Sequence, residues 1–199
     1  MLNMTSVHAY IDFEGKQPHL LEVCVLVTER HTPIRLFHRI ILPPNLHLLD
    51  SRQAKYCHCI PKWYVKQYGT PLHKVKEELY QLFDKLPHVE ICGYGDDSTK
   101  EFFMEFLPLM DLTHKRFRQV ELLPWKQRDS EPSHLRAQEM RQSWYKQWPC
   151  DAHSLPHVTN SEEKRRHGPH CAVTDCFELF MVNTKTLLRQ GDLYKMSDV

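Results

Sequence analysis

The segment "VHAYIDFEGKQPHLLEVCVLVTERHTPIRLFHRIIL" (residues 7–42) decides the fold class. It contains three apolar, β-branched stretches: Val7–Phe13, Leu20–Val27 and Ile34–Leu42. Short turns separate these stretches, and each turn contains a proline, so the pattern predicts an antiparallel meander of three strands. The pair Pro43–Pro44 ends the third strand, because proline cannot donate the hydrogen bond that a sheet needs.

Helices and strands alternate through the rest of the chain. Six apolar residues at helical spacing predict a helix over Pro71–Leu86, with the proline in its first turn. The other expected elements are a loop-rich stretch (Asn45–Thr70), a short buried strand (His88–Gly95), a helix broken near Pro108 (residues 96–110), a strand (Phe117–Leu123), a polar helix (Glu131–Trp148) and a final helix (Cys171–Arg189). We therefore expect an α/β fold in which helices flank a mixed sheet.

Composition narrows the class of protein. With 199 residues, of which 41% are hydrophobic, the chain is expected to form one domain over residues 1–199. The formal net charge is only +1, so any binding of nucleic acid must use local basic patches. No apolar run approaches the length of a membrane span. Seven cysteines without a signal peptide indicate a reducing compartment, and we expect a cytoplasmic location.

Acidic residues occupy positions where a fold alone does not need them. Asp12 and Glu14 are two apart on the first strand, so both side chains leave the same face. An exposed strand edge would also tolerate them, and that alternative stays open. Asp175 lies among apolar residues of the final helix, where an unpaired carboxylate is costly. Cys24, Cys92 and Cys176 also lie in apolar settings, and we expect all three in the core.

A third acidic position follows the buried strand. Asp96 and Asp97 lie where this strand meets a helix, and either could simply cap the helix. Four carboxylates from three distant segments could nevertheless meet: Asp12, Glu14, Asp97 and Asp175. Two divalent ions would neutralise them and would hold the attacking and leaving oxygens in phosphoryl hydrolysis. His170, five residues before Asp175, could accept a proton from the attacking water.

The order of these motifs resembles that of the DEDDh 3′–5′ exonucleases. The shared features are D-x-E on the first strand, an aspartate at a strand-to-helix junction, and H-x4-D opening a late helix. The resemblance implies a ribonuclease-H-like fold that uses two Mg²⁺ or Mn²⁺ ions. It places His170 as the general base and gives the ions four ligands: Asp12, Glu14, Asp97 and Asp175. Asp96 could replace Asp97, which we prefer.

A second set of residues has the chemistry of a zinc site. Cys150, His153 and Cys171 would supply three ligands, and a closed tetrahedral site needs a fourth. Glu22 is a charge inside the apolar "LLEVCVLV", where it needs a partner. An E-C-H-C quartet in this order resembles a branch of the DEDDh group that includes the arenavirus nucleoprotein exonuclease domain and the Maelstrom domain. The resemblance implies one structural zinc ion beside His170.

These patterns predict a 3′–5′ exonuclease that acts on RNA. The alternative is a catalytically weak RNA-binding module of Maelstrom type, and a metal-dependent endonuclease is a weaker third option. The basic residues Lys164, Arg165 and Arg166 precede His170 and could reach a phosphate that enters the site. Gly15 would let a nucleotide backbone approach closely. We expect "CHCIPKWY" (residues 57–64) to be a packed loop.

Overall fold

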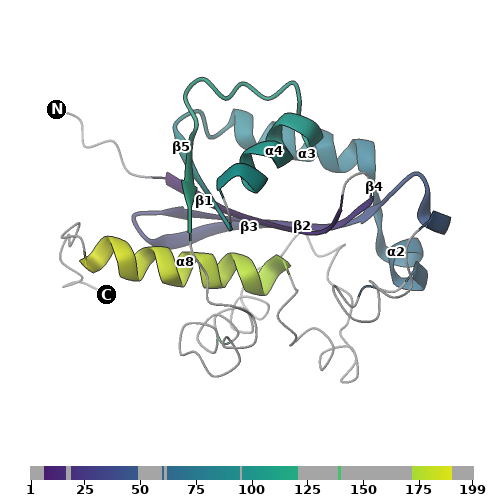
Figure 1. The fold of residues 1–199 in the computed structure, drawn as a ribbon, viewed down its shortest axis with the longest axis horizontal. Coiled ribbons are helices and arrows are strands. Elements are labelled where there is room, and N and C mark those ends of the chain that lie inside the picture. Colours follow the sequence, from purple (N-terminus) through teal and green to yellow (C-terminus); the bar gives the residue numbers. More distant parts are fainter. Residues whose placement is uncertain are drawn as a thin grey trace.

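Helices flank a six-stranded mixed sheet, as the sequence predicts (Figure 1). The computed structural model describes residues 7–16, 19–48, 60, 62–94, 96–120, 139 and 172–189. The strand order is β4-β3-β2-β1-β5-β6, so the first strand lies inside the sheet.

The predicted meander forms the centre of the sheet. It consists of β1 (Val7–Lys16), β2 (His19–Glu29) and β3 (Thr32–Leu42), each slightly longer than the sequence indicates. β2 and β3 are joined by Arg30 and His31, both with positive φ, which suits a two-residue hairpin turn. The third strand ends directly before the two prolines, which confirms their predicted effect.

Short parallel strands extend the meander at both edges. β5 (Val89–Gly93) pairs with β1, β6 (Arg116–Gln119) pairs with β5, and β4 (Thr70–Pro71) pairs with β3. Because β5 runs parallel to β1, the carboxyl ends of both strands face the same edge of the sheet. The segments that follow these two strands are therefore brought together.

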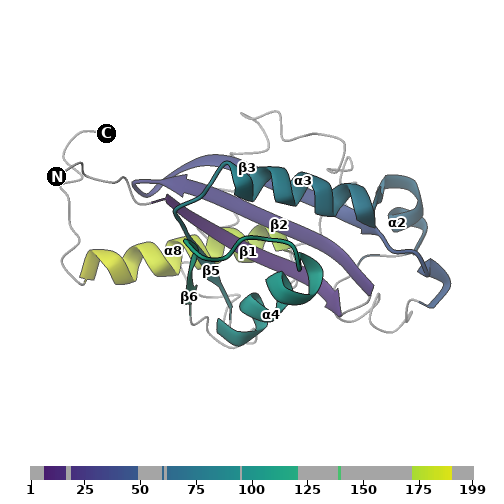
Figure 2. The same cartoon turned by 90° about the horizontal axis from the view of Figure 1, so that it is seen from above.

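The two faces of the sheet are covered by different helices. α3 (Leu72–Asp84) and α4 (Asp96–Phe106) lie on one face, and α8 (Ala172–Arg189) lies on the other (Figures 1 and 2). Alternate residues of β1 follow this division, because Ala9 and Ile11 belong to the core under α3 and α4, whereas Tyr10 packs against α8. The α8 face is thus the one onto which even-numbered residues of β1 project.

One element was missed in the sequence, and two boundaries move. The stretch predicted as loop contains a helix, α2 (Lys62–Tyr68), besides the short 3-10 helix η1 (Leu46–Leu48). The prediction was wrong there because the apolar spacing covers barely two turns, and Tyr64 and Val65 form a helix by packing against β3. Pro71 precedes α3 as its N-cap residue instead of lying in its first turn.

The remaining predicted elements agree where the structure describes them. α4 ends before the proline that was expected to break it, and α8 begins one residue after the predicted start. The strand predicted over Phe117–Leu123 is observed as β6, and its last three residues lie outside the described part of the chain. Most of the helix predicted over Glu131–Trp148 also lies outside it. No helix among the described residues is long and apolar enough to cross a membrane.

Candidate metal centre

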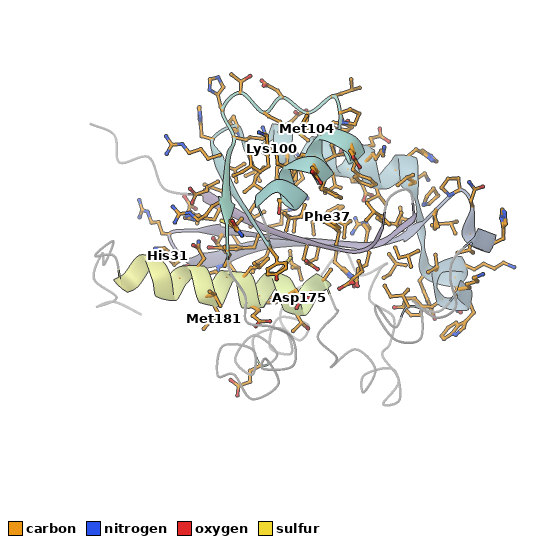
Figure 3. All side chains as sticks on the ribbon, in the orientation of Figure 1. His31, Phe37, Lys100, Met104, Asp175 and Met181 are labelled. Carbon is orange, nitrogen blue, oxygen red and sulfur yellow. The ribbon has the colours of Figure 1, made fainter. Side chains whose placement is uncertain are left out.

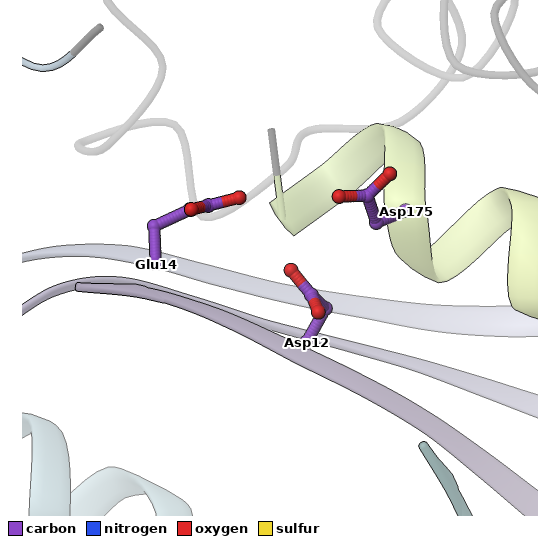
Figure 4. A group of neighbouring side chains, drawn as sticks. All are labelled: Asp12, Glu14 and Asp175. Atoms are coloured by element: carbon purple, nitrogen blue, oxygen red, sulfur yellow. The ribbon is translucent and has the colours of Figure 1, made fainter. Parts of the chain in front are cut away.

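Three carboxylates converge where β1 meets the first turn of α8. Asp12 and Glu14 come from β1, and Asp175 comes from α8 (Figure 4). One carboxylate oxygen from each residue lies within 4.8 Å of those of the other two. Glu14 and Asp175 are each only 6% exposed, and Asp12 is half-buried. Residues 161 positions apart in the sequence thus form one acidic cluster, which could hold a metal ion.

A buried thiol holds Asp175 over the first strand. The Sγ of Cys176 lies 3.3 Å from the backbone oxygens of both Tyr10 and Cys24, and its single proton is shared between these two acceptors. Burial raises the pKa of the Cys176 thiol, so the group keeps the proton that it donates. Cys24 is also the residue opposite Asp12 in the β1–β2 pairing. α8 is therefore attached to both strands at the level of the acidic cluster. Cys24, Cys92 and Cys176 are all buried, as predicted.

A β-bulge shapes the end of β1. The register with β2 shifts between Glu14 and Gly15, and Gly15 has a φ of 100°. A side chain is strongly disfavoured at this φ, so the backbone itself requires glycine here. Bulges re-aim neighbouring side chains, and this one directly follows Glu14. The sequence suggested a different reason for Gly15, the approach of a nucleotide, which stays a prediction.

The electrostatics of the cluster favour a bound cation. Two full negative charges at such a separation repel by on the order of 3–4 kcal/mol at an effective dielectric constant of about 20. Carboxylate oxygens are hard ligands of the kind that Mg²⁺ and Mn²⁺ prefer. The three residues therefore fit a divalent ion in both charge and ligand type.

The fourth predicted carboxylate lies on the adjacent element. Asp97 is the second residue of α4, which follows β5 closely. α4 approaches β5 so tightly that a Cβ on Gly93 would lie 1.9 Å from the Oγ1 of Thr99. The backbone thus carries Asp97 past the carboxyl end of the strand beside β1. The side chains of Asp96 and Asp97 lie outside what the structure describes, so the choice between them stays a prediction.

Glu22 has a partner that was missed in the sequence. It is 1% exposed, and its Oε1 lies 2.6 Å from the Nε2 of His38 on β3. Glu22 is also opposite Glu14 in the β1–β2 pairing, which places it beside the acidic cluster. The signal was present, since His38 is a polar residue inside "IRLFHRIIL". The register that sets it opposite Cys24, diagonal to Glu22, cannot be read from the sequence.

Several predicted site residues lie outside the described part of the chain. They are the predicted general base, the other three predicted zinc ligands and the basic run: His170; Cys150, His153 and Cys171; Lys164, Arg165 and Arg166. Their roles stay predictions.

The opposite end of β1 carries a balanced group of charges. His8 Nε2 lies 3.2 Å from Glu90 Oε2 on β5, and Arg118 Nε on β6 lies 2.9 Å from the same oxygen. The hydrogen bond from His8, with further help from Arg118, lowers the pKa of Glu90 below its ordinary value. Nearby, Asn183 of α8 donates a hydrogen bond of 2.9 Å to the Tyr10 hydroxyl. Burial raises the pKa of this hydroxyl, which keeps it neutral.

No protein-family model matches this sequence, and no curated protein matches it. Solved structures do match. E. coli exonuclease I in complex with a dA16 oligonucleotide superposes with a TM-score of 0.60 at 15% identity, over 94% of this chain and 42% of that one. A 3′-exonuclease that recognises the histone mRNA stem-loop superposes with a TM-score of 0.56 at 16% identity, over 94% of this chain and 65% of that one.

This chain therefore spans less than half of exonuclease I, and identities this low show the fold alone. Exonuclease I from Methylocaldum szegediense gives the same result, with a TM-score of 0.57 at 15% identity over 94% of this chain and 41% of that one. The chain has the ribonuclease-H-like fold of these exonucleases, a mixed sheet between helices, and carries an acidic cluster at the end of its first strand.

Proposed function

We propose that this chain is a metal-dependent 3′–5′ exonuclease that hydrolyses the phosphodiester bonds of RNA. The observation that carries the proposal is the convergence of Asp12, Glu14 and Asp175 within 4.8 Å, in a fold that known 3′-exonucleases share. The choice of RNA rests on the resemblance of the motifs to the zinc-containing DEDDh branch. One of the similar structures is an exonuclease that recognises an mRNA, which supports the same choice.

Each predicted site residue then has a task. Asp12, Glu14, Asp97 and Asp175 hold two Mg²⁺ or Mn²⁺ ions. Such ions lower the pKa of a bound water and stabilise the charge that develops on the phosphate. His170 accepts the proton of the attacking water. Gly15 gives the terminal nucleotide room near the site, and the basic run Lys164–Arg166 contacts a phosphate of the substrate.

A structural zinc ion completes the proposal. Its ligands are Glu22, Cys150, His153 and Cys171, and it would join β2 to the segment before α8 without a disulfide. The burial of Glu22 next to Glu14 supports this location, because an ion there would hold the general base close to the acidic cluster. His38 already contacts one oxygen of Glu22 and would orient the carboxylate for the metal.

Digestion of end-labelled substrates tests the activity. Single- and double-stranded RNA and DNA, labelled at either the 3′ or the 5′ end, are incubated with Mn²⁺, Mg²⁺ or EDTA. We expect immediate release of the 3′ label from RNA with either metal, gradual shortening of the 5′-labelled strand, and no reaction in EDTA. Internal fragments at the earliest times would identify an endonuclease instead. Tight binding of RNA without any cleavage would identify the Maelstrom-type module.

A further inference from the structure

α2 presents an aromatic and basic surface that the catalytic proposal leaves unused. Trp63 is 52% exposed, and Lys66 and Gln67 are also exposed. These three residues are spaced at i, i+3 and i+4, so they share one side of the helix. Tyr64 and Val65 occupy the opposite side and are buried. The helix sequence "KWYVKQY" contains two lysines and no carboxylate.

The helix that carries this surface packs on β3, two strands from the strand of Glu14. Tyr64 and Val65 belong to the same core cluster as Ile40 of β3. Ile40 is opposite Glu22 on β2, and Glu22 is opposite Glu14 on β1. Two strand spacings therefore separate Ile40 from Glu14, about 10 Å across the sheet.

The surface and the cluster also lie on the same side of the sheet. Figure 1 places α2 and α8 on one side, opposite α3 and α4. Figure 3 places Asp175 at the end of α8 that lies toward α2. A ligand that leaves the acidic cluster in this direction runs toward α2.

We propose that α2 binds the single-stranded part of the substrate upstream of its 3′ end. A base stacks on the Trp63 ring, and a phosphate contacts the Lys66 amine. Lys62 lies one turn before Lys66, and its Nζ donates a hydrogen bond of 3.1 Å to the backbone oxygen of His47, which fixes this second amine beside the surface. Aromatic stacking combined with lysine contacts is how proteins hold single strands without reading their sequence.

The chemistry of the surface selects nucleic acid over a protein partner. One tryptophan and two amines on a two-turn helix cover far less than the roughly 1,000 Å² that a specific protein interface needs. Two amines near a flat aromatic ring match the repeating phosphate and base of a nucleic acid. The chain as a whole is nearly neutral, so this local positive charge is not part of a general basic surface.

α4 offers a matched control on the other side of the sheet. Met104 is 59% exposed, and Lys100 is exposed one helical turn before it (Figure 3). This pair repeats the combination of an exposed apolar side chain and an amine, but α4 covers the face opposite α8. Met104→Ala and Lys100→Gln should therefore leave RNA binding unchanged.

The test measures RNA affinity and turnover for two lengths of substrate. Fluorescence anisotropy in EDTA gives the Kd for a labelled single-stranded RNA of roughly ten nucleotides. Trp63→Ala should raise this Kd about 5- to 150-fold, the range for one stacked base, and Trp63→Phe should restore most of the loss. Lys66→Gln should lower the magnitude of the salt slope by about 0.7, the value for one phosphate of a single strand. With a dinucleotide substrate and Mn²⁺, all three variants should turn over like the wild type.

This inference rests on the proposed function, because it assumes that the 3′ end of the substrate lies at the acidic cluster. The outcomes of the test distinguish the two proposals. A wild type that cleaves RNA, together with a folded Trp63→Ala variant of unchanged Kd, overturns the α2 surface and leaves the exonuclease standing. Loss of activity on the dinucleotide in Trp63→Ala would also overturn it, because the residue would then act through the acidic cluster. If Trp63→Ala weakens RNA binding but the wild type cleaves no substrate, the α2 binding surface is supported and the proposed exonuclease activity is rejected. Thermal melting of each variant shows that it is folded.

Discussion

β1 carries ionisable side chains at both ends, and α8 covers both ends. The charged groups are arranged in opposite ways at the two ends. At the amino end, the Glu90 carboxylate meets His8 and Arg118, so the protein supplies its own counter-charge. At the carboxyl end, Asp12, Glu14 and Asp175 point toward one another. The first arrangement stabilises the folded chain. The second adds repulsion that a divalent cation would relieve.

The two ends should therefore respond differently to the loss of a carboxylate. Removal of Glu90 takes away a favourable interaction, so stability should fall. Removal of Asp175 takes away one charge of the acidic cluster, so repulsion within the cluster should fall and any metal-dependent activity should disappear. The following four experiments examine this contrast in order of decreasing effect.

The largest effect is expected for Asp175→Asn, which removes a charge and barely changes the shape of the side chain. A metal ion contributes several kcal/mol to the stabilisation of the transition state. At one factor of ten for each 1.36 kcal/mol, its loss should reduce the rate of RNA hydrolysis at least about 10³-fold. Thermal melting in EDTA should show that the variant is folded. A variant that keeps wild-type turnover would remove Asp175 from the active site.

A smaller loss is expected for His170→Ala. A general base typically contributes about 10²- to 10⁴-fold in rate. Since the acidic cluster is untouched, Mn²⁺ should bind as in the wild type, which isothermal titration calorimetry would measure. Unchanged activity would mean that His170 is not the general base and only precedes the proposed zinc ligand Cys171. Reduced Mn²⁺ binding would mean that the histidine belongs to the metal site itself.

Zinc content tests whether a structural zinc ion binds at Glu22, beside the acidic cluster. Glu22→Gln and Cys150→Ser should both lose zinc and melt at a lower temperature, because a bound structural ion adds its binding free energy to folding. Elemental analysis after dialysis against mild EDTA gives the zinc content. Cys59→Ser is the control and should keep both properties. If Glu22→Gln lowers the melting temperature but keeps the zinc, Glu22 serves only as the partner of His38.

The smallest effect on stability is expected at the amino end of β1, where Glu90 contacts His8 and Arg118. The folded-state pKa of Glu90 lies below its ordinary value of 4.5, mainly through the hydrogen bond from His8. The unfolded chain therefore binds a proton first as the pH falls. Stability from this group is complete above about pH 4.5 and disappears as the pH falls through the lower folded pKa.

Glu90→Gln should consequently destabilise the protein at neutral pH by up to about 1 kcal/mol, since the pair is partly exposed. The difference from the wild type should vanish in acid. Urea unfolding at a series of pH values measures both effects, with Glu101→Gln on the exposed side of α4 as the control. A constant difference at every pH would show that Glu90 acts by packing and not through its charge.

Local patterns explain the parts of the fold that could be predicted. The three strands of the meander were recognisable because apolar stretches alternate with proline-containing turns. α3 was recognisable because its apolar residues repeat over more than three turns. Asp175 indicated the candidate site because an unpaired carboxylate among apolar helix residues is energetically costly. Each of these signals is contained in a few consecutive residues.

Contacts across the sheet could not be predicted, because they depend on strand order and register. Nothing in the residues of β5 and β6 specifies that they line up beyond β1, yet this order alone brings Glu90 to both His8 and Arg118. The pairing of Glu22 with His38 depends on the length of the turn between β2 and β3. α2 was missed because a helix of seven residues gains its stability from packing rather than from its own sequence.

The attachment of α8 to the first strand has a consequence for synthesis on the ribosome. Cys176 and Tyr10, which form one of the contacts that hold Asp175 in place, are 166 residues apart. A nascent chain that has emerged as far as Val120 contains every strand that the structure describes but lacks Asp175. The acidic cluster is completed only when the last described helix has been translated and has docked. A product that ends before α8 would lack Asp175 and could not complete the acidic cluster, so the proposed activity would be absent until synthesis of this helix.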